Sequence, residues 1–226
     1  MKALRVLSVF GTRPEAIKMC PLALELAGRP EFESLVCVTA QHREMLDSVL
    51  DTFGVTPEYD LDLMEPEQTL AGLTGKILRD LGAVLREAKP DIVLVHGDTT
   101  TSFAGALSAF YEKIPVGHVE AGLRSFMMAM PEEQNRRLTD HLSTYLFCPT
   151  ETAVQNLARE GIADSAGSTG GKPLADCKRV CMTGDIMYDA NLYYRAHNNV
   201  KIEDKDFILL TIHRQENTDN IERLSS

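Results

Sequence analysis

The chain has 226 residues, of which 44% are hydrophobic and 25% charged, and its formal net charge at pH 7 is -10. This composition is typical of a globular protein with a buried core, and the length suits one large domain or one domain and part of a second. The acidic charge argues against a surface that binds nucleic acid or an anionic membrane. No apolar run reaches the roughly 18 residues that a membrane helix needs.

The start of the chain and its cysteines indicate a cytoplasmic protein. Met1 to Leu4 lead directly into an apolar run, so we expect no signal peptide. The five cysteines are odd in number and scattered, which predicts reduced thiols. Cys177 and Cys181 lack a second pair of metal ligands at the usual spacing, so we expect no metal site.

Short apolar runs alternate with segments of helical periodicity along the first 165 residues. Such alternation predicts repeated βαβ units, so the expected fold class is α/β with a Rossmann-like, doubly wound parallel sheet. The expected strands are 4–10, 35–39, 92–95, 116–119 and 145–148, the expected helices are 14–27, 45–53, 70–88, 99–111, 132–142 and 150–160, and 57–66 is expected to be a loop.

The composition changes after Gly161, where Ser, Thr, Gly and Pro become frequent. We therefore predict an N-terminal domain at 1–165, a linker at 166–178, and at 179–226 the start of a second Rossmann-like domain that is incomplete. The second domain is expected to contain a helix through Tyr188 and a strand at 207–212 that ends at His213.

Several cofactor and catalytic motifs are missing. Gly170-Gly171-Lys172 is not expected to be a phosphate loop, because Ala166 and Pro173 stand where such a loop needs glycine and a hydroxyl residue. No G-x-G-x-x-G follows a strand, so a nicotinamide cofactor is not supported. No G-x-S-x-G elbow is present, so serine hydrolysis is not supported either.

Polar motifs follow the predicted strands at the points where they end. Because the carboxyl ends of parallel strands meet at one edge of a sheet, we expect these motifs to share one ligand-binding crevice. They are Gly11-Thr12-Arg13, Gln41-His42, His96-Gly97-Asp98 and His118-Val119-Glu120. The first is also a candidate anion cradle that would combine backbone N–H groups with a guanidinium.

Carboxylates in this crevice suggest acid/base chemistry. Asp98 has a second interpretation as the N-cap of the following helix, and Glu132 and Glu133 as first-turn acids that suit a helix dipole. Glu120 caps nothing and precedes a glycine, which favours a functional role. Like charges close together cannot all ionise freely, so one carboxyl is expected to have a raised pKa.

Cations and histidines complete the predicted crevice. The cationic partners available to it are Arg13, Lys18, Arg124 and Arg136. Among the histidines at strand ends, His213 is the candidate acid/base group, because charged residues flank it in a polar loop.

In chain order, these motifs resemble the non-hydrolysing UDP-N-acetylglucosamine 2-epimerase family over nearly the whole chain. The set is specific, although no single block is. The blocks are Gly11-Thr12-Arg13-Pro14-Glu15-Ala16-Ile17-Lys18, Ala40-Gln41-His42, Gln68-Thr69-Leu70, His96-Gly97-Asp98-Thr99-Thr100-Thr101, His118-Val119-Glu120-Ala121-Gly122-Leu123-Arg124-Ser125, Pro131-Glu132-Glu133-Gln134-Asn135-Arg136, Pro149-Thr150-Glu151 and Thr211-Ile212-His213-Arg214-Gln215-Glu216-Asn217.

The resemblance implies two Rossmann-like domains in a GT-B arrangement, an active site between them, and a homodimer. It implies interconversion of UDP-GlcNAc and UDP-ManNAc for cell-surface polysaccharide precursors, without NAD or metal. A base removes the proton at sugar C2 while the C1–O bond to UDP breaks, and UDP then adds back to 2-acetamidoglucal with protonation on the opposite face. Two faces require two acid/base groups.

The family's functional residues carry over to matching positions of this sequence. Its essential carboxylates and histidine resemble Asp98, Glu120, Glu132 and His213, and which carboxylate serves which face stays open. Its substrate-binding cations resemble Arg13, Lys18 and Arg136. The positions at which some bacterial members bind a second, activating UDP-GlcNAc resemble Gln41, His42, Arg43 and Gln68.

Departures from the family pattern leave alternatives open. The loop from Ser125 to Met130 is short, and 183–190 differs from the commoner Thr-Gly-Asn-Thr-Val-Ile-Asp-Ala. Both variants occur in relatives that epimerise UDP-diacetamido-glucuronate. A hydrolysing epimerase that releases ManNAc and a GT-B glycosyltransferase are the other enzyme classes. The family's later Asp-Ser-Gly-Gly-x-x-Glu-Glu stretch is absent, so we expect a fragment with little or no turnover of its own.

Overall fold

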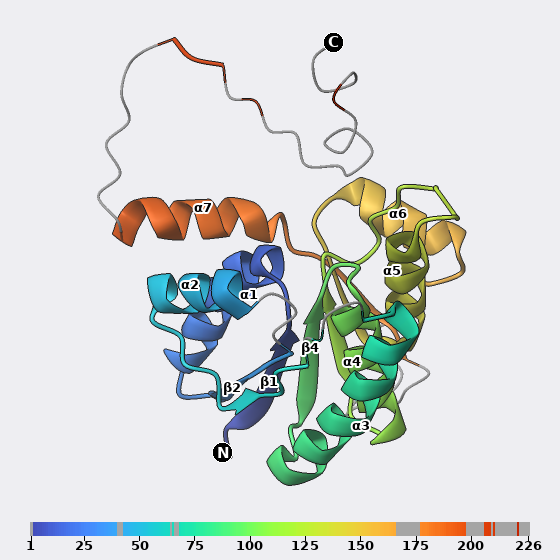
Figure 1. Ribbon diagram of the computed structural model, residues 1–226. Helices are drawn as coiled ribbons and strands as arrows, with labels where there is room; N and C mark the ends of the chain where they lie inside the picture. The colour runs from blue at the N-terminus through green and yellow to red at the C-terminus, as the bar shows by residue number, and fades with distance from the viewer. Residues whose placement is uncertain are drawn as a thin grey trace. The chain divides into compact units, whose positions relative to one another are not determined.

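The computed structural model describes residues 2–39, 43–63, 65, 68–165, 177–197, 206–208, 210 and 221, and of Arg43 and Glu44 only the backbone. The chain divides into two compact units, 1–194 and 195–226. The first unit contains a seven-stranded parallel sheet in the order β3-β2-β1-β4-β5-β6-β7 (Figure 1). The expected α/β class with a doubly wound parallel sheet is confirmed.

Strands and helices alternate along the described residues, as the periodicity predicts. None of the described helices is long and apolar enough to cross a membrane. The strands are β1 (Leu4–Phe10), β2 (Phe32–Val38), β3 (Tyr59–Asp60), β4 (Ile92–His96), β5 (Val116–Val119), β6 (Tyr145–Cys148) and β7 (Arg179–Met182), and the helices are α1 (Arg13–Ala27), α2 (Arg43–Phe53), α3 (Leu70–Ala88), α4 (Thr100–Tyr111), α5 (Pro131–Leu142), α6 (Glu151–Arg159) and α7 (Ile186–His197).

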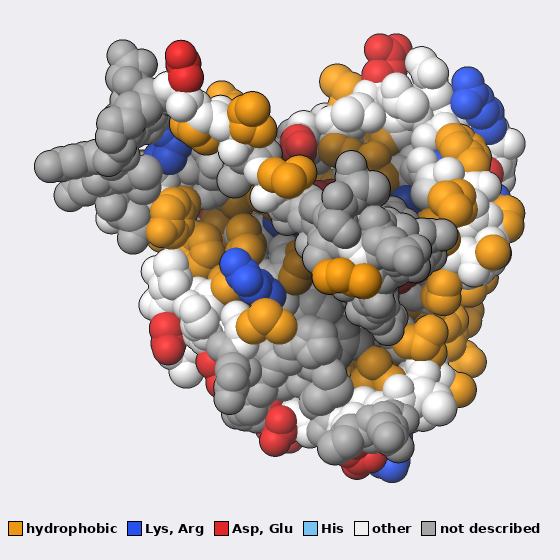
Figure 2. All heavy atoms as spheres, turned by 45° about the horizontal axis from the view of Figure 1, so that its top comes forward, with side chains coloured by type: hydrophobic (Ala, Val, Ile, Leu, Met, Phe, Trp, Pro, Cys, Tyr) orange, Lys and Arg blue, Asp and Glu red, His pale blue; other side chains and the backbone are white. Residues whose placement is uncertain are grey.

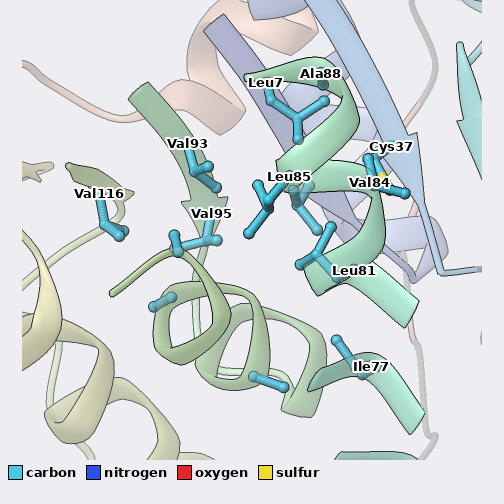
Figure 3. Close-up of a cluster of buried hydrophobic side chains, with 14 of the residues drawn as sticks. Leu7, Cys37, Ile77, Leu81, Val84, Leu85, Ala88, Val93, Val95 and Val116 are labelled. Atoms are coloured by element: carbon cyan, nitrogen blue, oxygen red, sulfur yellow. The ribbon is translucent and has the colours of Figure 1, made fainter. Parts of the chain in front are cut away.

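Alternate side chains of the strands enter two cores on opposite faces of the sheet. On one face, Leu7 and Val93 pack with Ile77 and Leu81 of α3, as Figure 3 shows. On the other face, residues of β1 and β2 pack against α1 and α2, which lie together on that side of the sheet in Figure 1. Chain reversal between β1 and β4 therefore places the crevice of a doubly wound sheet at the carboxyl ends of these strands.

Strand β3 lies within the segment expected to be a loop. It has only two residues, Tyr59 and Asp60, and they pair with Cys37 and Val38 of β2. So short a strand carries too few residues for an alternating pattern, and the prediction of a loop at 57–66 missed it for that reason.

Strand β7 follows the predicted linker and is the edge strand of the same sheet. It pairs in parallel with all four residues of β6, and Val180 packs against the cluster that contains Leu146 and Leu157. The expected boundary near residue 165 therefore does not coincide with an edge of the sheet, and the first compact unit continues to Tyr194. Phe207 and Ile208, expected in a strand, are not in one, and Leu209 and 211–213 lie outside the described residues.

One part of the sheet face on the side of α1 and α2 is open. A hollow of about 670 Å³ lies there, with Leu94, Val119 and Phe147 among its lining residues. Leu22 of α1 and Ile186 of α7 also line it. Helices α3 to α6 belong to the cores of the opposite face, and the apolar residues of β4 to β7 that line the hollow are buried or half-buried.

Candidate active site at the carboxyl ends of β1, β4 and β5

The turns that follow β1 and β4 are joined by one buried carboxylate. Glu15, 2% exposed, accepts hydrogen bonds through Oε2 from the backbone N–H groups of Gly11 (3.0 Å) and Thr12 (2.7 Å). Its Oε1 accepts from the hydroxyls of Thr99 (2.7 Å) and Ser102 (3.2 Å). Two of the backbone N–H groups of the anion cradle predicted at this turn are therefore already bonded.

Asp98 lies at the end of β4 and does not cap the helix behind it. The N-cap of α4 is Thr99, whose Oγ1 accepts the backbone N–H of Ser102 at 3.1 Å. The interpretation of Asp98 as the N-cap is therefore wrong, because the next residue supplies the hydroxyl that the first turn needs. The Asp98 carboxylate, 35% exposed, pairs instead with Arg136, and Asn135 donates to its backbone carbonyl at 3.0 Å.

Glu120 follows β5 and is held between two cationic groups. Its Oε1 lies 2.7 Å from Lys18 Nζ, and its Oε2 lies 3.2 Å from His96 Nε2. The buried imidazole of His96 is thus the neighbour of one carboxylate oxygen, and the Lys18 ammonium is the neighbour of the other. Glu120 has a φ of 66°, the left-handed region that non-glycine residues rarely adopt.

The surroundings of Glu120 keep its carboxyl ionised. Burial by itself raises the pKa of Glu120, but the hydrogen bond and charge of His96, together with the Lys18 ammonium, lower that pKa to about 2. The side chain is only 13% exposed, so solvent screens these cations weakly. Glu120 is thus not the carboxyl with a raised pKa that the clustering of acids predicts.

The two acids in the first turn of α5 differ sharply in their surroundings. Glu132 is exposed and makes no ion pair among the described residues. Glu133 is fully buried and accepts hydrogen bonds from the Ser125 backbone N–H (2.9 Å), the Ser125 hydroxyl (3.0 Å) and Arg137 Nε (3.0 Å). Burial opposes ionisation of Glu133, yet the Ser125 donors and the Arg137 guanidinium leave its pKa below the usual value.

Three of the predicted ligand-binding residues lie near the crevice. Arg13, the first residue of α1, is exposed and lines a hollow of about 560 Å³ together with Phe53 and Tyr194. Lys18 and Arg136 reach the crevice as partners of Glu120 and Asp98. The cation predicted at Arg124 does not face the crevice, because its buried guanidinium bonds Asp140 and Glu160.

Part of the predicted site falls outside the described residues. His213, Gln41 and His42 are not described, and neither is the side chain of Arg43. Gln68 precedes the N-cap of α3, and its Nε2 donates to the carbonyl oxygen of Leu63 at 3.1 Å. Where the structure is described, no group of three or more His, Cys, Asp or Glu side chains is arranged to hold a metal ion.

Some residues that shape the site do not stand out in the sequence. Glu15 has a readable signal, because threonine followed three positions later by glutamate is a capping box. Asp140 has none: it lies in the last turn of α5, fully buried, with its Oδ1 2.6 Å from His118 Nδ1. Its burial depends on how α5 packs against β5, which local periodicity does not specify.

Comparison with known proteins places the chain in a family. The model of the family described as UDP-N-acetylglucosamine 2-epimerase matches residues 24–226. The UDP-N-acetylglucosamine 2-epimerase of Escherichia coli (strain K12) is 52% identical over 94% of this chain and 57% of its own length, and that of Bacillus subtilis (strain 168) is 50% identical over 96% and 56%. This chain therefore spans less than two thirds of the length of these relatives.

Solved structures give the same result for the fold. The UDP-GlcNAc 2-epimerase of Neisseria meningitidis bound to UDP-GlcNAc is 49% identical with a TM-score of 0.76, covering 87% of this chain and 51% of that one. The Methanocaldococcus jannaschii enzyme in complex with UDP-GlcNAc and UDP is 39% identical with a TM-score of 0.83, covering 98% and 60%. The family match, the identities and the shared fold together establish that this chain belongs to the UDP-N-acetylglucosamine 2-epimerase family.

Proposed function

We propose that the chain is the N-terminal part of a non-hydrolysing UDP-N-acetylglucosamine 2-epimerase that interconverts UDP-GlcNAc and UDP-ManNAc. The observation that carries this proposal is Glu120, a buried and ionised carboxylate at the edge where a doubly wound sheet binds ligands. Relatives at about half identity bear the name of this activity, and the Neisseria meningitidis structure is titled as bound to UDP-GlcNAc.

The chemistry needs a base on one face of sugar C2 and an acid on the other. An ionised Glu120 suits removal of the C2 proton, and Asp98 and Glu132 are the acidic groups available for the other face. His213 is the further acid/base candidate. A positioned acid/base group contributes roughly 10² to 10⁴ in rate, so loss of either partner should be severe.

Lys18 links substrate binding to the basicity of Glu120. In the free chain its ammonium is committed to Glu120 at 2.7 Å. The diphosphate of a UDP-sugar carries more negative charge than one carboxylate, so it would draw Lys18 toward itself when it enters the crevice. Glu120 would then lose a cation that lowers its pKa and become a stronger base only when substrate is present.

Isotope exchange tests the activity directly. The complete protein, incubated with UDP-GlcNAc in heavy water, should place deuterium at C2 of the sugar in both epimers. Because the proposed elimination removes this proton, a protein that releases UDP-GlcNAc without deuterium would refute the proposal. Glu120→Gln in the same assay should abolish the exchange.

Product analysis separates the alternatives. The non-hydrolysing reaction returns UDP-ManNAc, whereas a hydrolysing relative releases free ManNAc and UDP. If deuterium were incorporated only into UDP-diacetamido-glucuronate, the proposed substrate would be wrong and the proposed mechanism would stand. Transfer of the sugar to an acceptor without C2 exchange would indicate a glycosyltransferase.

The remaining properties proposed for the complete protein follow from the family. It is proposed to be a cytoplasmic homodimer with a second Rossmann-like domain, in a GT-B arrangement, and to use no NAD or metal. Gln41, His42, Arg43 and Gln68 are proposed to bind an activating UDP-GlcNAc.

A further inference from the structure

His118 on β5 is fully buried between two acceptors. Its Nδ1 lies 2.6 Å from Asp140 Oδ1, and its Nε2 lies 2.7 Å from the carbonyl oxygen of Gly97. Asp140 also accepts the Gly122 N–H at 3.3 Å, and its Oδ2 contacts the Arg124 guanidinium. Both ring nitrogens of His118 therefore face an oxygen atom, and each contact is a hydrogen bond when that nitrogen carries the proton.

Arg124 connects Asp140 to a second carboxylate, that of Glu160. Its Nη1 lies 2.8 Å from Asp140 Oδ2, and both side chains are completely buried. On its other side, the same guanidinium bonds both carboxylate oxygens of Glu160, with Nε at 2.9 Å and Nη2 at 2.7 Å. Such a two-point contact fixes the orientation of the planar group as well as its distance.

The chain of charges then returns to Asp98. Arg137 Nη1 lies 3.3 Å from Glu160, and Arg137 Nε lies 3.0 Å from Glu133. Glu133 is 3.5 Å from Arg136, which pairs with Asp98. Asp98 directly follows Gly97, the residue whose carbonyl accepts from His118, so the sequence of contacts closes on itself.

We call this closed circuit the ion-pair ring. In it, His118 and three arginines alternate with four carboxylates, so each buried carboxylate has a partner on either side. The ring joins the end of β4, β5 and its following turn, α5, and the end of α6. Asp98 and Arg136 are the two members of the ring to which the proposed function gives a role. The other members contact them from one side.

We propose that the ion-pair ring is a positioning device that fixes Asp98 and Glu120 relative to each other. This proposal rests on the proposed function. Glu120 and Gly122 have φ values of 66° and 79°, and the ring anchors the chain on both sides of them, at His118 and at Arg124. The backbone of Gly97 passes close enough to Glu120 that a Cβ there would lie 4.0 Å from Oε2. A displacement of about 1 Å in such a site can lower a rate by about 10²-fold.

The first test does not depend on activity. In ¹⁵N-labelled chain at pH 7, nitrogen-15 and proton NMR should show both ring nitrogens of His118 protonated, with the signal identified by its loss in His118→Gln. A single protonated nitrogen would overturn the ring at its buried end. The same spectrum of Glu160→Gln should keep both protons, because Asp140 and Gly97 remain in place.

The second test opens the ring where it is partly exposed. Arg137→Gln and Glu160→Gln in the complete protein should each lower kcat by about tenfold or more while KM changes less than twofold. The double variant should be no slower than the slower single variant, because a ring is opened only once. Glu160→Asp and Arg137→Lys should recover part of kcat.

The matched control is Arg159→Gln, which removes an exposed charge next to Glu160 that is not in the ring. Equal loss of kcat in this control, additive losses in the double variant, or an effect on KM alone would overturn the proposal. If unaltered protein does not exchange C2 of UDP-GlcNAc, the proposed function fails by itself. The NMR measurement then still decides whether the ring exists.

Discussion

Glu120 is the residue at which burial and charge compete most directly. The site excludes most of the water that would stabilise the ionised carboxylate. Lys18 and His96 compensate for this loss of solvation. An unfolded glutamate has a pKa near 4.5, so the lowered pKa of about 2 means that ionised Glu120 contributes stability above pH 4.5 that is lost as the pH falls through 2. The contribution at neutral pH is on the order of 3 kcal/mol.

Lys18→Met should reduce that contribution and raise the pKa of Glu120. The substitution keeps much of the aliphatic chain and removes the cation, so burial is opposed by His96 alone. Urea unfolding between pH 2 and pH 7 should then show stability lost at a higher pH than in the unaltered chain. Lys76→Met is the control, because Lys76 pairs with Glu65 at an exposed site, and its loss should leave the pH dependence unchanged.

Glu132 and Glu133 are neighbours with opposite expected phenotypes. Glu132→Gln should change the free energy of unfolding by less than about 0.5 kcal/mol, because the side chain is exposed. In the complete protein it should lower kcat by roughly 10² to 10⁴, as expected for an acid/base group. Glu133→Gln should instead destabilise the chain by about 3 kcal/mol, because it leaves two arginines without their buried partner.

Urea unfolding of both variants and steady-state kinetics measure this contrast. A large stability loss in Glu132→Gln would contradict its exposed position. Unchanged stability in Glu133→Gln would contradict its burial.

Among the elements, the β1–α1 turn shows how closely the crevice is packed. A Cβ on Gly11 would lie 2.0 Å from Thr39 Oγ1 and 2.7 Å from Thr101 Oγ1, and these two hydroxyls are hydrogen-bonded at 2.9 Å. No side chain fits between them without moving β2 or α4. The absence of a side chain at Gly11 therefore lets three elements meet where the candidate site begins.

Elements with a clear apolar pattern could be predicted from the sequence, and features that depend on contacts between distant segments could not. The bounds of β1, α3, β5 and β6 agree with expectation because each buries a regular set of apolar residues. The shared edge of Asp98 and Glu120 also follows from strand alternation. Local sequence pattern has no signal for contacts between distant segments. Three features depend on such contacts: the N-cap at Thr99, the burial of Glu133 and the pairing of β7 with β6 in the same sheet.

A cut within the predicted linker should not separate the segments on its two sides. With a specific protease site inserted between Gly170 and Gly171, the cleaved chain should elute as one species in native gel filtration, because β7 pairs with β6 and Ile186 packs in the α1–α2 core. Denaturant should release the C-terminal piece. Adding Val180→Asp and Ile186→Asp should allow separation without denaturant, and separation of the unaltered cleaved chain would contradict the pairing.

For the molecule as a whole, the open hollow on the sheet is a prominent apolar feature, with Leu94, Val119 and Phe147 among its lining residues. Figure 2 shows hydrophobic side chains at several places on the face that it draws, between isolated charged ones. The chain also spans only 57% of the length of its Escherichia coli relative. We therefore expect this apolar hollow to be a surface that is covered in the complete protein.

The isolated chain should therefore bind a hydrophobic dye such as ANS and show little or no epimerase turnover. Leu22→Gln with Leu26→Gln should weaken dye binding, because both side chains line the hollow. Phe126→Ser is the control, since Phe126 is 62% exposed but lies outside that hollow. Equal loss of fluorescence in both variants, or full activity of the isolated chain, would contradict this view.

The two ends of the sheet have a consequence for how copies of this chain could associate. Strand β3 closes one side with only two residues, and β7 closes the other with four, beginning at the half-exposed Arg179. Because β3 pairs with only Cys37 and Val38, it leaves most of the outer edge of the seven-residue β2 uncovered, whereas the border at β7 is short and has a charge beside it. Salt should therefore promote association of copies of this chain through its apolar surface, and any strand pairing between copies should begin at the border beside β3 rather than at β7.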